Sequence, residues 1–90
     1  MKLVKQLSPY YQFAVERSKG TITNLEILND YKFSFIYPGD EHCQVTIAYD
    51  SVSDTVVLYQ KYPEDNSEAD DDISLNGFKK YLGREKPVLK

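Results

Sequence analysis

Carboxylates are the most concentrated reactive groups of this sequence. Between residues 64 and 72 the chain carries six of them and no basic residue: Glu64, Asp65, Glu68, Asp70, Asp71 and Asp72. A calcium loop of the EF-hand type needs a glycine at its sixth position and a bidentate acid at its twelfth. Counted from Asp70, those positions hold Leu75 and Tyr81. We therefore expect no metal ion at this run, and its excess of like charges predicts a solvated surface segment.

His42 and Cys43 are adjacent and supply the residue types of a general base and a nucleophile. Neighbours in a strand point to opposite faces, so the two side chains would not meet. Cys43 is expected on the core face, where a free cysteine behaves as a small hydrophobe. The four glycines are isolated and form no phosphate-binding loop. We expect no catalytic residue and no cofactor, and hence a protein that is not an enzyme.

The charges are sorted along the chain. From residue 21 to residue 78, twelve acids face two bases, Lys32 and Lys61, whereas segments 1–20 and 79–90 are both basic. The acidic middle opposes direct nucleic-acid binding by the basic ends, which would need a dominant basic footprint. It suits a basic protein partner, because long-range attraction speeds the encounter. The acids predicted to contact such a partner are those of two expected turns and of the acidic run: Asp40, Glu41, Asp50, Asp54, Glu64, Asp65, Glu68, Asp70, Asp71 and Asp72.

Composition indicates that one small domain, residues 1–90, positions these groups. The chain is 41% hydrophobic and has eight Tyr and four Phe, which is enough for a core. It has a single cysteine, no apolar leader, and no apolar run near the roughly 20 residues that a membrane helix needs. We expect a cytoplasmic protein that does not enter the membrane.

Helix signals mark both ends of this domain. A helix over residues 8–20 is predicted by Ser8 as N-cap and Gly20 at the C-terminal end. A shorter helix begins after Asp72 or Ser74 as cap and ends at Gly83. The apolar faces expected to pack are Tyr10, Phe13 and Ala14 in the first helix and Leu75, Phe78 and Leu82 in the second. For residues 1–7 the pattern leaves a helical turn and a short edge strand open.

Apolar and polar residues alternate over residues 31–37 and again over 43–49. This period of two predicts two strands joined by the turn at Pro38-Gly39. One register keeps apolar side chains opposite one another. It pairs Tyr37 with Cys43, Phe35 with Val45 and Phe33 with Ile47.

A third strand follows the next turn, within the β region that ends at Tyr62. If the turn contains the three residues 51–53, Val45 pairs with Tyr59. That register places Val56 and Leu58 on the face away from the helices.

The predicted fold class is α+β: a three- to four-stranded antiparallel meander with an N-terminal and a C-terminal helix packed on one face. Residues 21–28 supply the fourth strand through a turn at Asn29-Asp30, with Leu25 and Ile27 toward the core. Segment 64–72 is expected to be a flexible acidic connector, and segment 84–90 a frayed tail.

This pattern favours a small macromolecule-binding protein. Its acidic rim, which consists of the ten acids named above, docks onto a basic protein surface. An inhibitor or regulator of a nucleic-acid-processing machine is one form that such a protein could take. A first alternative is a homodimerising or scaffolding module that uses the open sheet face or an edge strand, through Ile36, Val56 and Leu58. A second alternative is a small-ligand binder or enzyme with a pocket between the helices and the sheet.

Overall fold

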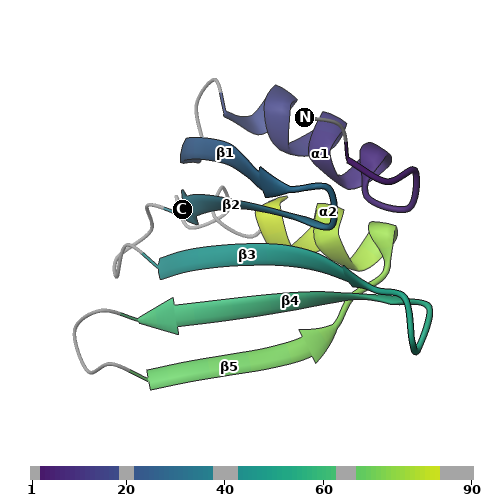
Figure 1. The fold of residues 1–90 in the computed structure, drawn as a ribbon. Coiled ribbons are helices and arrows are strands. Elements are labelled where there is room, and N and C mark those ends of the chain that lie inside the picture. Colours follow the sequence, from purple (N-terminus) through teal and green to yellow (C-terminus); the bar gives the residue numbers. More distant parts are fainter. Residues whose placement is uncertain (1–2, 19–21, 38–42, 63–66, 84–90) are drawn as a thin grey trace.

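The fold is one antiparallel sheet with two helices (Figure 1). The computed structural model describes residues 3–18, 22–37, 43–62 and 67–83. Their elements are α1 (Ser8–Arg17), β1 (Thr23–Asn29), β2 (Lys32–Tyr37), β3 (Cys43–Asp50), β4 (Thr55–Tyr62), β5 (Ser67–Asp72) and α2 (Leu75–Gly83). The strands lie in chain order, β1-β2-β3-β4-β5. The α+β class and the antiparallel meander are confirmed, and the sheet has one strand more than the most that the sequence predicts.

Both helices cover the same face of the sheet, as Figure 1 shows. The ring of Tyr11 in α1 lies 5.3 Å from that of Phe33, and the ring of Phe78 in α2 lies 6.3 Å from that of Phe35. The buried apolar residues form one core: Leu7, Tyr10, Ala14, Ile22, Phe33, Phe35, Cys43, Val45, Ile47, Val56, Leu58, Phe78, Tyr81 and Leu82. Neither helix is long and apolar enough to cross a bilayer, among the residues that the structure describes.

The start of α1 differs from the prediction. Leu7 occupies the N-cap position without a side-chain hydrogen bond, and Ser8 is already helical. The cause is the preceding turn, in which the Leu7 and Ser8 amides donate to the Val4 carbonyl and start the helical course early. Of the two options for residues 1–7, the turn is therefore correct over 5–7. The helix ends at Arg17, and the predicted stop at Gly20 lies outside the described residues.

The start of α2 follows the sequence signal. The Ser74 hydroxyl accepts the Gly77 amide at 3.0 Å, which makes Ser74 the cap, and Asp72 belongs to β5 instead. Phe78 and Leu82 are fully buried, and Leu75 packs against the core at its margin. The helix is thereby fixed to the sheet through the face that its apolar spacing predicts.

The first predicted hairpin is confirmed in its register. Phe35 lies opposite Val45 and Phe33 opposite Ile47, all four in the core. The fourth predicted strand is also present as β1, and its Ile27 lies opposite Phe33. Cross-strand apolar pairs on one face were sufficient to specify the register of β2 with β3. The pairing of β1 with β2 is irregular, because its register shifts between Thr23 and Glu26 and again between Ile27 and Asn29.

The second hairpin is shifted by one residue from its prediction. Its loop contains four residues, 51–54, because Asp50 pairs with Thr55 and Asp54 adopts a left-handed backbone (φ 59°). Val45 therefore faces Gln60 rather than Tyr59. A shift of one residue exchanges the two faces of a strand, so the predicted placement of Val56 and Leu58 on the open face is wrong. Both side chains are buried in the core.

Residues 67–72 form the edge strand β5 instead of part of a flexible connector. Six consecutive residue pairs join β5 to β4, from Tyr62–Ser67 to Val57–Asp72. The strand ends where the Ile73 amide donates to the Val56 carbonyl at 2.8 Å and the Ile73 carbonyl accepts the Tyr10 hydroxyl at 2.8 Å. Backbone pairing with β4 and this anchor place the acids on the sheet.

Candidate functional site

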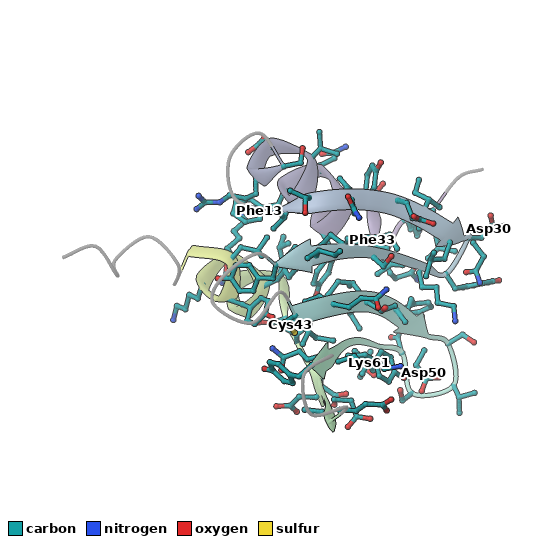
Figure 2. All side chains as sticks on the ribbon, turned by 90° about the vertical axis from the view of Figure 1, so that its left-hand side faces the viewer. Phe13, Asp30, Phe33, Cys43, Asp50 and Lys61 are labelled. Carbon is teal, nitrogen blue, oxygen red and sulfur yellow. The ribbon has the colours of Figure 1, made fainter. Side chains whose placement is uncertain are left out.

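The structure describes six of the ten predicted acidic residues, and these six form two groups. Asp40, Glu41, Glu64 and Asp65 lie outside the described residues, as does the tail 84–90. Asp50 is the last residue of β3 and Asp54 the last residue of the loop that follows, and the remaining four, Glu68, Asp70, Asp71 and Asp72, all lie on β5. Figure 2 shows side-chain oxygens gathered along β5 at the edge of the sheet, below the labelled Lys61.

The register determines which of these carboxylates share a face. Alternate residues of a strand point to the same side, and paired residues lie side by side. Three acids of β5, namely Glu68, Asp70 and Asp72, therefore lie on the face away from the helices, opposite Lys61, Tyr59 and Val57 of β4. Asp71 lies on the other face, opposite the buried Leu58. We call the first side the open face; across β2 to β5 it consists of Lys32, Ser34, Ile36, Gln44, Thr46, Ala48, Val57, Tyr59, Lys61, Glu68, Asp70 and Asp72.

Every side chain of β5 from residue 68 to residue 72 is exposed. These five residues therefore contribute no buried side chain to the core, and the position of the strand depends on backbone pairing with β4 and on the Ile73 anchor. Aspartate is among the residues that are depleted in strands. A row of three carboxylates on the open face, and Asp71 on the other face, are thus held in order at exposed positions.

Tyr59 lies at the centre of the open face beside this row, and 45% of its surface is exposed. Two shallow hollows share it. One, of about 420 Å³, is lined by Thr46, Lys61 and Asp70 among others, and one of about 310 Å³ includes Tyr31 and Val57. Tyrosine combines apolar area with a polar tip and is enriched in the contact surfaces of proteins. Most of the residues that line the two hollows lie on the open face.

The loop between β3 and β4 is ordered by its own aspartates. Asp50 accepts the Val52 amide at 3.0 Å, and Asp54 accepts the Tyr49 hydroxyl at 2.5 Å. The hydrogen bond to Asp54, together with the nearby negative charge, raises the pKa of Tyr49. Asp50 and Asp54 therefore act first as turn residues, with Asp50 also bordering the smaller hollow.

The described residues offer little that could perform catalysis. Cys43 is buried on the core face with its sulfur 3.7 Å from the Gln44 carbonyl, and His42 lies outside the described residues. In the part of the chain that the structure describes, no three His, Cys, Asp or Glu side chains are grouped to hold a metal ion. Along β5 the acids alternate between faces, which prevents neighbouring carboxylates such as Asp70 and Asp71 from converging on one ion.

Tyr59 and Val57 are the residues of this face that sequence reasoning missed. Their positions depend on the four-residue loop, and the signal was Asp54, since aspartate tolerates the left-handed conformation that a longer turn requires. The position of Tyr59 on the open face of β4 could then have been anticipated.

Comparison of the chain with protein-family models, with curated proteins and with solved structures finds no significant match.

Proposed function

We propose that this protein is a non-enzymatic binding module that docks onto a basic surface of another protein. Its contact surface is the acidic strand β5 together with the adjoining part of the open face around Tyr59. The observation that carries the proposal is that residues 68–72 of β5 hold four exposed carboxylates in order while adding no side chain to the core. A strand with that composition has little value for stability, so selection for contact explains it better than selection for packing.

Electrostatics supports the same conclusion. Lys61 is the single base opposite β5 on the open face, where it faces Glu68, while Asp70 faces the uncharged Tyr59. The remaining field along this edge is negative, and a basic protein surface would be attracted over roughly a Debye length of 8–10 Å. The tyrosine and the two hollows provide the less polar centre that protein interfaces usually contain.

One class of suitable partner is a protein whose basic groove normally holds phosphates. Carboxylates spaced along a rigid strand can occupy such a groove in place of the phosphate groups. Regulation or inhibition of a nucleic-acid-processing protein is therefore the biological role that we favour.

The homodimer alternative loses most of the residues that suggested it. Val56 and Leu58 are buried under the helices, which leaves Ile36 as the single member of that set on the open face. A dimer through this face would have to use Tyr59 and Val57 instead.

A charge-matched capture experiment tests the proposed function. The variant Asp70→Asn/Asp72→Asn neutralises two of the three β5 carboxylates on the open face, and the control Glu16→Gln/Asp30→Asn removes the same charge from α1 and from the β1–β2 turn. Both are used as bait in a lysate at low salt, after urea unfolding has shown equal stability. We expect the control to retain a basic partner that the β5 variant loses, and raised salt to release it from the wild type. Equal retention by the two variants would exclude β5 as the contact surface.

A further inference from the structure

The outer edge of β5 has a property that separates it from the other edge of the sheet. β5 is the last strand in the order, and no described element pairs with its outer side. Alternate residues of such a strand direct their backbone N–H and C=O groups away from the sheet. Figure 1 shows β5 along the border of the sheet, beyond the area that α1 and α2 cover. Its backbone is therefore a potential template for a further strand.

Natural sheets usually protect their edges with bulges, prolines or lysines. The edge strand β1 is irregular in this way, because its pairing with β2 shifts between Thr23 and Glu26 and again between Ile27 and Asn29, and Asn24 has a φ of 57°. β5 has neither proline nor lysine, and its six pairs with β4 are consecutive. The β5 edge is thus regular, and charge is the single protection that the described residues give it.

The kind of charge determines what can pair there. In a two-fold antiparallel pairing of two β5 strands, residues on the same face meet. If Asp70 faces its own copy, Glu68 faces Asp72 of the second copy, and a shift by two residues places Glu68 against Asp70 or Asp70 against Asp72. Each arrangement sets carboxylates directly opposite one another, which is destabilising. The charges of this edge therefore disfavour antiparallel pairing with a second copy of this chain.

A basic strand is complementary at the same positions. Glu68, Asp70 and Asp72 follow one another at about 6.7 Å along the open face, which is the spacing of alternate residues in any strand. An extended segment with lysine or arginine at every second position would place one cation beside each carboxylate. Its backbone would at the same time satisfy the outward N–H and C=O groups of β5.

We propose that β5 binds an extended, lysine- or arginine-rich segment of its partner by strand addition, as the sixth strand of the sheet. This inference rests on the proposed function and specifies its partner and its mode of binding. Backbone pairing provides affinity, and the alternation of charge on the open face selects the segment. The remaining residues of the segment lie on the other face of the sheet, beside Ala69 and Asp71.

The test uses backbone-modified peptides on the full chain. The probe is the blocked hexapeptide Lys-Thr-Lys-Val-Lys-Thr. Two analogues carry N-methyl groups, one on the three lysine amides and the other on the three remaining amides. All have the same charge, but only one set of amides can face β5. We expect the parent peptide to bind, one analogue to bind about tenfold more weakly or worse, and the other to bind like the parent.

Hydrogen exchange of the backbone amides provides the second readout. On binding of the parent peptide, alternate amides of β5 should gain protection, whereas Glu16→Gln should leave the affinity unchanged. Equal binding of both analogues, or binding without new protection in β5, would overturn strand addition while leaving electrostatic docking in place. Absence of peptide binding would also overturn strand addition. If the capture of the basic partner then proved independent of Asp70 and Asp72, the proposed function would fail with it.

Discussion

The hydroxyl of Tyr10 provides a sharp test of how the acidic strand is held. This hydroxyl donates to the Ile73 carbonyl at 2.8 Å and joins α1 to the junction between β5 and α2. Replacing Tyr10 with phenylalanine keeps the ring, which packs 5.5 Å from that of Phe78, and removes the hydrogen bond alone. The Ile73 carbonyl then loses a partner in a partly buried position.

The expected cost follows from these contacts. A typical hydrogen bond contributes about 0.5–1.5 kcal/mol, and an acceptor left unsatisfied adds to the loss, so we expect the free energy of unfolding to fall by about 1.5 kcal/mol. For a domain of this size that is a decrease in Tm of about 6–12 °C. Because Ile73 follows β5 directly, exchange of the β5 amides should also become faster.

The pH dependence of the free energy of unfolding gives a second test of this prediction. Burial raises the pKa of Tyr10 above its ordinary value of 10.0, since the charged form is disfavoured in the fold. The stabilisation is therefore complete below pH 10 and is lost as the pH rises through the pKa of the folded state. At pH 8 the free energy of unfolding of the wild type should exceed that of Tyr10→Phe by about 1.5 kcal/mol. This difference should become smaller above pH 10, because phenylalanine cannot ionise.

Urea unfolding at several pH values, with amide exchange at neutral pH, measures these effects. Tyr11→Phe is the control, because the Tyr11 ring packs on Phe33 and no hydrogen bond of its hydroxyl is seen among the described residues. If Tyr10→Phe is as stable as this control, or if β5 exchanges at the wild-type rate, the anchoring role that we assign to the hydroxyl is wrong.

Three further predictions test the register of β4, the loss of stability at high pH and the charges of the acidic row. Leu58→Ala should lower the free energy of unfolding by about 3 kcal/mol and Val57→Ala by less than about 1.5 kcal/mol, because only the first deletes core volume; the reverse order in urea unfolding would favour the three-residue loop. Burial also raises the pKa of Tyr81, so stability should fall above pH 10, and Tyr81→Phe should flatten that fall in urea midpoints taken from pH 8 to pH 11; an unchanged slope would contradict this. Asp70→Asn should change stability by less than about 0.5 kcal/mol, because the residue is exposed and its acidic neighbours on β5 are about as close in the unfolded chain. A gain above about 1 kcal/mol in low-salt urea unfolding would show that folding itself brings repelling charges together.

The parts of the fold that sequence predicts are those in which side-chain pattern alone decides. In the hairpin of β2 and β3, one face is apolar on both strands, so Phe35 against Val45 is the single pairing that buries both. In the next hairpin, β4 carries apolar residues at Val56, Val57, Leu58 and Tyr59, and either register offers an apolar face. The left-handed backbone of Asp54 then decides between them, and this is a property of the loop rather than of the strand.

β5 could not be predicted from its residues, because Ser67–Asp72 has no apolar alternation and low strand propensity. The extended structure of β5 follows from the positions of the residues that precede and follow it. β4 finishes at Tyr62, whereas Ile73 is hydrogen-bonded beside Val56 near the start of β4, so the chain must return along almost the whole strand. At about 3.3 Å per residue, that distance is most directly covered by an extended backbone next to an unpaired edge. The acidic composition is therefore compatible with a strand that the tertiary fold imposes.

The meander topology has a consequence for the order of folding. Every strand pairs with its neighbour in the chain, so the whole sheet can form through short loops. The bond from Tyr10 to Ile73 instead joins groups 63 residues apart, and closing a flexible loop of that length costs about 3–4 kcal/mol of chain entropy. Hairpins should therefore assemble first, and the union of the two ends of the chain should complete the transition late. On this route the acidic strand becomes fixed only in the final step, when α1 and α2 meet behind the sheet.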